Sequence, residues 1–292
     1  MSDTPALPRP AATSGDSLSG FLYALAAYLL WGFLPLYMKA LAHIPPPEVI
    51  AHRVVWSVPI ALAVLWWTGR TADLRAALVS PRMLGMGAMT AALISVNWGI
   101  YVWAIGSGHA LDAALGYYIN PLFSIFLGAV LLGERMGRLQ MAAIALAVVA
   151  LGLTLTWGAY AYLKKRLPIG PNQGFALEVL ILLVPAIGYM VWLATQGTSH
   201  FRQGVALDDA LLLGCGIVTA VPLMVYANGA KRLTLSTIAI MQYIAPTMIF
   251  LTAVFVFDEP FSQVKLLAFG LIWAALVIYS TPILAGRLKV RS

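Results

Sequence analysis

The sequence predicts an all-α integral membrane protein, and three features predict it: the composition, the length of the apolar blocks and an internal repeat. Of the 292 residues, 61% are hydrophobic and 10% are charged, and the mean hydropathy is +0.86. A soluble domain carries roughly 25% charged residues. A chain with so few charges cannot cover its surface with polar groups, so we expect it to fold within lipid.

Nine apolar blocks follow one another along the chain, and each is near the ~20 residues that a helix needs to cross the hydrocarbon. They lie at about 20–41, 47–67, 83–106, 110–132, 138–163, 174–194, 208–228, 233–257 and 263–285. A membrane barrel would instead show alternating segments of ~10 residues. The connections are short, so we expect one transmembrane domain over 19–286 and no soluble domain.

The distribution of Lys and Arg favours ten crossings over nine. If the block 138–163 is a hairpin that crosses twice, fourteen of the eighteen basic residues fall on the inner side, as the positive-inside rule requires. Both termini are then cytoplasmic. The tail 1–18 is expected to be disordered, and the tail 287–292 is basic.

The internal repeat agrees with ten crossings. Tyr118-Ile119-Asn120-Pro121 is echoed 125 residues later by Tyr243-Ile244-Ala245-Pro246. Five crossings per half is an odd number, so the two halves run in opposite directions. Such inverted repeats are typical of secondary transporters, whose substrate site lies near the bilayer midplane where the halves meet.

The two repeats overlap in the sequence, the first covering about 19–155 and the second about 146–286. The block 138–163 would therefore have to supply two helices. Either this hairpin is abnormally short, or a segment of about one helix length is missing near Leu151–Thr156. The sequence leaves both readings open.

Two prolines, Pro121 and Pro246, each lie about eleven residues into an apolar block. Proline has no N–H and clashes with the carbonyl four residues earlier, here that of Tyr117 or Gln242. A break of this kind is tolerated in a membrane where the freed carbonyl finds a partner. We expect a pair of kinks that act as hinges beside a central cavity; the alternative is two kinks satisfied by helix packing.

The candidate substrate-binding residues are amides, hydroxyls and aromatic rings, because polar groups in membrane helices usually face the bundle interior. Asn97 and Tyr101 share a helix face at i,i+4. The full set is Trp31, Tyr37, Asn97, Trp98, Tyr101, Tyr117, Tyr118, Asn120, Trp157, Gln242 and Tyr243. Such a cavity suits a neutral or zwitterionic solute with an aromatic or apolar body. For each ring, the alternative is the interfacial belt or helix packing.

Charged residues gather at the block ends. Glu48, His52 and Arg53 lie at the outer end of the second block and are candidates for proton coupling, since histidine titrates near neutrality. The alternative is a mutually paired cluster at the interface. With no Lys or Arg expected at mid-membrane, phosphorylated cargo is disfavoured. Glu134 and Glu259 are expected to cap the helices that follow them.

Several other classes of function lack their sequence signatures. Cys215 is the only cysteine, and zinc-protease and serine-hydrolase motifs are absent, so we expect neither an enzyme nor a metal or cofactor site. No P-loop is present, which argues against coupling to ATP. The net charge of +7 concerns orientation and lipid headgroups, and no nucleic-acid partner is expected.

Four stretches resemble the drug/metabolite transporter superfamily, specifically its EamA-domain, RarD-like branch. They are Ala27-Tyr28-Leu29-Leu30-Trp31-Gly32 with Pro35-Leu36-Tyr37, Ala51-His52-Arg53-Val54-Val55-Trp56-Ser57, Asn97-Trp98 through Gly108-His109 to Gly116-Tyr117-Tyr118-Ile119-Asn120-Pro121, and Leu235-Ser236-Thr237 through Gln242-Tyr243-Ile244-Ala245-Pro246 to Glu259-Pro260-Phe261. The resemblance implies ten helices as two inverted five-helix repeats in a bacterial-type inner membrane. The compressed block 138–163 departs from that pattern.

The resemblance also implies transport, since many members export small metabolites and the related YddG exporters move aromatic amino acids. We therefore expect an exporter of small amphiphilic metabolites, with aromatic or hydrophobic amino acids as the specific expectation. Its partners would be that solute and membrane lipids, and a monomer is expected. The alternatives are export of other drug-like metabolites, a channel, or an intramembrane enzyme.

Overall fold

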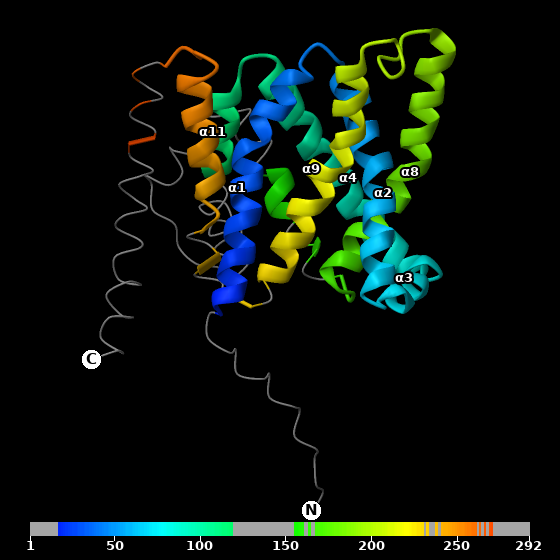
Figure 1. The fold of residues 1–292 in the computed structure, drawn as a ribbon. Coiled ribbons are helices and arrows are strands. Elements are labelled where there is room, and N and C mark those ends of the chain that lie inside the picture. The colour runs from blue at the N-terminus through cyan, green and yellow to red at the C-terminus, as the bar shows by residue number, and fades with distance from the viewer. Residues whose placement is uncertain are drawn as a thin grey trace, which may run out of the picture.

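The computed structural model describes residues 17–118, 155–160, 163–164, 167–230, 232–233, 237–238, 241–261, 263, 266 and 269–270. Within these ranges the regular structure is helical. The labelled helices are α1 (Leu18–Ala40), α2 (Pro46–Trp67), α3 (Thr71–Leu78), α4 (Pro81–Gly106), α8 (Pro171–Gln196), α9 (Ala206–Ala230) and α11 (Ile244–Phe255). Residues 110–118 and 155–160 are also helical. Most of the long helices stand side by side, with their connections at the two ends of a bundle (Figure 1).

Five of these helices, α1, α2, α4, α8 and α9, are long and apolar enough to cross a membrane. Their bounds lie within three residues of the predicted blocks. Within the described residues, the prediction of helices that can span a membrane is therefore confirmed. The ten crossings and the inverted repeat stay predictions, because 119–154 and 271–292 lie outside the described residues.

Local signals explain where the helices begin and end. Ser17 accepts a hydrogen bond from the Gly20 amide at 3.1 Å, as an N-cap does. The helices α2, α4 and α8 each begin with proline, whose missing N–H costs nothing in the first turn. Gly197 ends α8 at a φ of 67°, a left-handed conformation that glycine adopts without strain.

A short helix, α3, lies at one end of the bundle beside the end of α2 (Figure 1). The pattern of apolar blocks did not predict α3. At eight residues it is too short and too polar to register as an apolar block. It is tied to the start of α8, where the Gln173 amide donates to the Asp73 carboxylate at 3.2 Å.

The break predicted around Pro246 has a different form from a kink. Residues 242–243 form a turn, and α11 begins only at Ile244. Pro246 therefore lies in the first turn of a new helix, where its lack of an N–H is tolerated. The Thr247 hydroxyl donates to the Tyr243 carbonyl at 2.7 Å across this turn. The described part of 233–257 therefore has its break as a turn before a new helix, and the hinge role of Pro246 stays a prediction.

Glu259 caps a helix, but not the one that follows it. Its two carboxylate oxygens accept hydrogen bonds from the backbone amides of Ala110 at 2.8 Å and Leu111 at 2.9 Å. The negative charge therefore lies at the start of the helical residues 110–118, where the helix dipole favours it. This corrects the expectation that Glu259 caps its own downstream helix, and it links the two halves of the chain.

Replacing Glu259 by alanine should lower the free energy of unfolding by about 2 kcal/mol, because two buried backbone amides lose their acceptor. The change is measured as a lower melting temperature of the purified protein in detergent. Glu259→Gln is the matched control: it keeps one side-chain oxygen and should lose about half as much. Equal stability of Glu259→Ala and wild type would show that water replaces the carboxylate.

Candidate functional site

A cavity lies among the helices and encloses about 830 Å³ of space unoccupied by protein atoms, part of it open to the outside. Helices from both halves of the chain contribute to it. Its lining residues are Tyr28, Trp31, Leu34, Arg53, Asn97, Trp98, Tyr101, Tyr117, Trp157, Thr219, Leu223, Tyr226, Gln242, Ala245, Pro246 and Ile249. Its mixture of apolar and polar groups is typical of a small-molecule site.

One side of the cavity is aromatic, and we call Tyr28, Trp31, Trp157 and Tyr226 the aromatic cluster. The Trp31 ring lies 5.7 Å from Tyr28, 6.3 Å from Trp157 and 5.4 Å from Tyr226 between ring centroids. These separations are those of favourable edge-to-face and tilted ring pairs. The cluster joins α1 and α9 to the helical residues 155–160, so it presents ring faces and edges from three segments.

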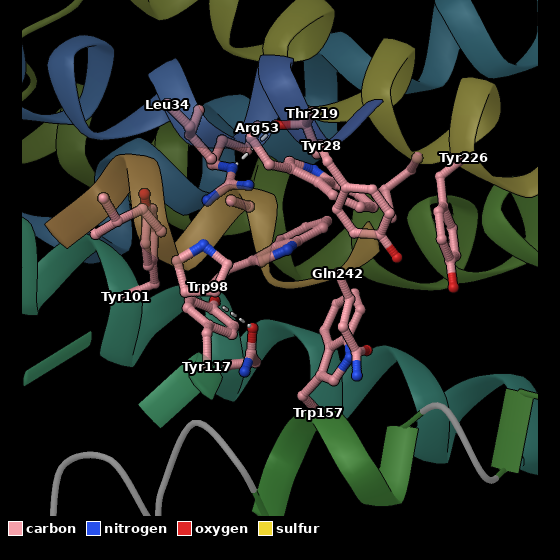
Figure 2. A pocket seen from close by; sticks show the side chains of 16 residues that line it. Tyr28, Leu34, Arg53, Trp98, Tyr101, Tyr117, Trp157, Thr219, Tyr226 and Gln242 are labelled. Atoms are coloured by element: carbon pink, nitrogen blue, oxygen red, sulfur yellow. Dashed lines mark hydrogen bonds between the residues drawn. The ribbon is translucent and has the colours of Figure 1, made fainter. Parts of the chain in front are cut away.

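The other side of the cavity carries amide and hydroxyl groups. The Asn97 amide donates to the Thr156 hydroxyl at 3.1 Å, and the Tyr117 hydroxyl donates to the Asn97 carbonyl at 3.4 Å. The Tyr101 hydroxyl is buried and has no hydrogen-bond partner among the described residues. Figure 2 shows Tyr101 and Tyr117 on one side of the labelled set, with Tyr28, Tyr226 and Trp157 on the other.

Arg53, predicted at the outer end of the second block, also reaches the cavity. It is the eighth residue of α2, about 10 Å along the helix from its start. Its Nε donates to the Thr219 hydroxyl at 2.9 Å, and its guanidinium carbon lies 4.5 Å from the Trp98 ring centroid. Arg53 is only 3% exposed. The argument against phosphorylated cargo rested on the absence of Lys or Arg at mid-membrane, and a buried arginine in the cavity weakens it.

The predicted site residues divide into three groups. Those that line the cavity are Trp31, Asn97, Trp98, Tyr101, Tyr117, Trp157, Gln242, Pro246 and Arg53. Tyr37, Tyr118, Tyr243, Glu48 and His52 are not among its lining residues. Asn120 and Pro121 lie outside the described residues.

The tyrosines that do not line the cavity make packing contacts elsewhere. Tyr37 donates its hydroxyl hydrogen to the Leu211 carbonyl, joining α1 to α9. Tyr118 is fully buried, and its hydroxyl lies 2.5 Å from that of Thr247. Its ring stacks on Tyr243 at 6.0 Å. These contacts match the packing alternative for the three rings.

Comparison with known proteins identifies the relatives of this chain. The model of the EamA-like transporter family matches residues 18–156. An uncharacterized transporter of Vibrio cholerae is 40% identical over 281 residues, which are 91% of this chain and 93% of that one. Protein RarD of Streptomyces exfoliatus is 38% identical, over 90% of this chain and 88% of its own.

This chain belongs to the EamA-like transporter family.

Protein RarD of Escherichia coli is also similar, at 37% identity over 89% of this chain and 93% of its own. A solved crystal structure of a protein shares the fold, with a TM-score of 0.57, 18% identity, and coverage of 89% of this chain and 96% of that one. The family and the names of these relatives indicate a multi-pass membrane transporter, not an enzyme. Its cargo is therefore a small molecule.

In this EamA-like transporter, Glu48 is paired, but not with its neighbours in sequence. Its carboxylate accepts from the His200 amide at 2.7 Å and pairs with the His200 ring at 2.8 Å. The His52 ring instead accepts from the Trp56 indole at 2.9 Å. The alternative of a mutually paired cluster of Glu48, His52 and Arg53 does not match these contacts, because the loop after α8 supplies the partner of Glu48. Their role in proton coupling stays a prediction.

Sequence reasoning missed several residues of the site and its support. Tyr28, Thr219 and Tyr226 line the cavity, but each lies within an apolar run that gave no spacing signal. Beside the cavity, the buried Glu178 carboxylate accepts from the Lys164 ammonium at 2.6 Å and from the Tyr160 hydroxyl at 3.2 Å. An acidic residue inside an apolar block is itself a signal of function or pairing. Within the described residues, no acidic, histidine or cysteine side chains form a metal-binding group.

Proposed function

We propose that this protein is a secondary transporter that exports small amphiphilic metabolites with an aromatic or bulky apolar body, with aromatic amino acids as the most specific candidates. The observation that carries the proposal is the two-sided cavity: the aromatic cluster on one side, and Asn97, Tyr101 and Tyr117 on the other. Rings pair favourably with rings, while buried amides and hydroxyls select a solute with polar groups of its own.

Alternating access around this cavity is the proposed mechanism. The lining comes from α1, α2 and α4 in the first half of the chain and from α9 and the start of α11 in the second half. A rocking motion of one half against the other would open the cavity to each side in turn. The turn at 242–243 offers a place where backbone angles can change without breaking a helix.

The proposed location is a bacterial-type inner membrane with both termini cytoplasmic. The described basic residues Arg70, Arg75, Arg82 and Lys164 lie near the end of the bundle where α1, α4 and α8 begin. The positive-inside rule makes that end cytoplasmic. Protease accessibility of epitope tags at each terminus in right-side-out cells would test this placement.

Purified protein reconstituted into liposomes tests the transport proposal. Labelled tryptophan or phenylalanine should cross the membrane, and unlabelled aromatic amino acids should compete with the label, while alanine and glutamate should not. Equal, background-level movement of every amino acid would contradict the amino-acid proposal. Movement of an unrelated drug-like metabolite under the same conditions would then leave transport intact with a different cargo.

Asn97→Ala should reduce the initial rate of aromatic amino-acid transport about 10-fold, because the Tyr117 and Thr156 hydroxyls lose the amide that orders them. Asn228→Ala is a matched control: Asn228 lies in α9 outside the cavity lining, and its amide donates to the Met224 carbonyl at 2.8 Å. The control should transport at the wild-type rate. Equal rates in Asn97→Ala and Asn228→Ala would remove Asn97 from the site.

A further inference from the structure

Arg53 is the one charged side chain among the described residues that line the cavity. The other fifteen are aromatic, aliphatic, hydroxyl or amide residues, and none is acidic. The ion pairs among the described residues do not include Arg53 either. Because arginine keeps its proton under all ordinary conditions, the described lining of the cavity holds a positive charge with no acidic side chain beside it.

Such a charge is costly to bury, so its retention needs a reason. Removing a cation from water carries a penalty of several kcal/mol unless a partner repays it. In membrane helices, an ionisable residue of this kind marks a functional site by default. The ring face of Trp98 offsets part of the cost through a cation–π contact at 4.5 Å, but a ring does not accept the hydrogen bonds of a guanidinium fork.

The guanidinium is held in place by one hydrogen bond, and another of its N–H donors has no partner among the described residues. Its Nε is fixed by the Thr219 hydroxyl, which in turn donates to the Cys215 carbonyl at 2.7 Å. Its Nη1 is buried and has no partner among the described residues. The Tyr101 hydroxyl, also a cavity-lining group, is buried and likewise unpartnered within the described part of the chain. Figure 2 shows the nitrogens of Arg53 directed into the space between Trp98 and Tyr101.

We propose that Arg53, oriented by Thr219 and Trp98, is the carboxylate subsite of this cavity, so that the transported solute is a monocarboxylate with an aromatic body. The planar guanidinium matches a carboxylate in shape as well as charge. One arginine without a lysine or a second arginine suits a monoanion better than a phosphate dianion. The aromatic cluster on the far side of the cavity would receive the ring of the same solute. This subsite rests on the proposed function for its role in transport, but not for its binding chemistry.

Two kinds of solute carry this chemistry, the zwitterion of an aromatic amino acid and a simple aromatic acid. Binding to purified wild-type protein in detergent separates them with four probes: phenylalanine, 3-phenylpropionate, phenethylamine and phenyl phosphate. At least one carboxylate should bind about 10- to 100-fold more tightly than phenethylamine, which lacks the carboxylate. Preference for phenylalanine identifies the zwitterion, and preference for 3-phenylpropionate identifies the simple acid.

Other outcomes would overturn the proposal. Phenethylamine binding as tightly as both carboxylates would show that the carboxylate is not recognised. Failure of both carboxylates to bind has the same consequence. Tighter binding of phenyl phosphate than of both carboxylates would replace the carboxylate subsite by a phosphate subsite.

Substitutions test whether Arg53 causes the preference for carboxylate probes over phenethylamine. Arg53→Gln should lower carboxylate affinity to the level of phenethylamine, whose own affinity should not fall. Thr219→Val keeps the charge and removes only the hydroxyl that orients it, and should weaken carboxylate binding about 3- to 10-fold. Arg75→Gln, on the exposed surface of α3, is the matched control and should bind as wild type does. If Arg53→Gln does not fold, Thr219→Val and the wild-type probe series still decide the question.

The outcomes for binding and for transport are separable. Arg53-dependent carboxylate binding without movement of any aromatic solute into liposomes would leave the subsite standing and overturn the proposed function. Movement of aromatic amino acids at equal rates by wild type and Arg53→Gln would leave the proposed function standing and overturn the subsite.

Discussion

Gly216→Ala is expected to lower the free energy of unfolding by about 3 kcal/mol, although it adds a single methyl group. The helices α2 and α9 cross so closely here that a β-carbon on Gly216 would collide with the backbone carbonyl of Trp56 and lie 2.6 Å from its Cβ. Backbone atoms cannot rotate away as a side chain can. The two helices would have to separate. Small residues at membrane helix crossings allow the two backbones to approach closely, and alanine at this position would not.

The same crossing builds the cavity, so the substitution should also affect binding. Thr219 lies one turn after Gly216 on α9, and it receives the hydrogen bond of Arg53 from α2. Separating the helices would break this contact. The measurement is unfolding of the purified protein in mixed micelles, together with the affinity for an aromatic carboxylate.

Gly188→Ala is the matched control for this prediction. Gly188 lies within α8, where an added β-carbon meets nothing within 4 Å. Alanine favours a helix over glycine by up to about 1 kcal/mol, so this variant should be neutral or slightly more stable. Equal effects at the two positions would show that helix propensity, and not the crossing, governs the response.

Glu178→Ala should cost about 3 kcal/mol of stability, because it leaves the Lys164 ammonium without its partner. Glu178 is 1% exposed, while the Lys164 side chain keeps 18% exposure, which places the cost at the lower end of the range for broken buried ion pairs. Glu178 also accepts from the Tyr160 hydroxyl, which joins α8 to the helical residues 155–160 that carry Thr156 and Trp157. Transport should therefore fall together with stability.

The double variant Lys164→Met, Glu178→Met separates charge from packing. Replacing both partners by apolar side chains of similar length often restores or raises stability. Thermal unfolding of the single and double variants forms a double-mutant cycle. A double variant as unstable as Glu178→Ala would show that the Tyr160 hydrogen bond, and not the buried ion pair, carries the effect.

Several structural features could be predicted from the sequence because they depend on local chemistry. The five long helices follow from runs of apolar residues that match the thickness of the bilayer. Asn97 could be predicted as a cavity residue because burying an amide in an apolar helix costs free energy unless the amide faces other polar groups. Trp98 and Tyr101 followed from their places on the same helix.

Other features could not be predicted, because their partners are distant in the sequence. Arg53 and Thr219 are 166 residues apart, and Glu259 and Ala110 are 149 apart. A charged residue near a helix end fits an interfacial role as well as an interior one until the neighbouring helix is known. The sequence left both roles open for Arg53, and the tertiary structure favours the interior one, because α9 places the Thr219 hydroxyl beside the guanidinium.

The sequence by itself determined that this chain folds as helices in a membrane, since apolar length and scarce charge leave no other stable arrangement. It also determined which side chains are too polar for lipid. Only the tertiary structure decided which of them share a cavity, because membrane helices select their neighbours by close packing at small residues such as Gly216. That packing brings Arg53, Tyr101 and the aromatic cluster to one space, and turns a costly buried charge into a group that can bind a solute.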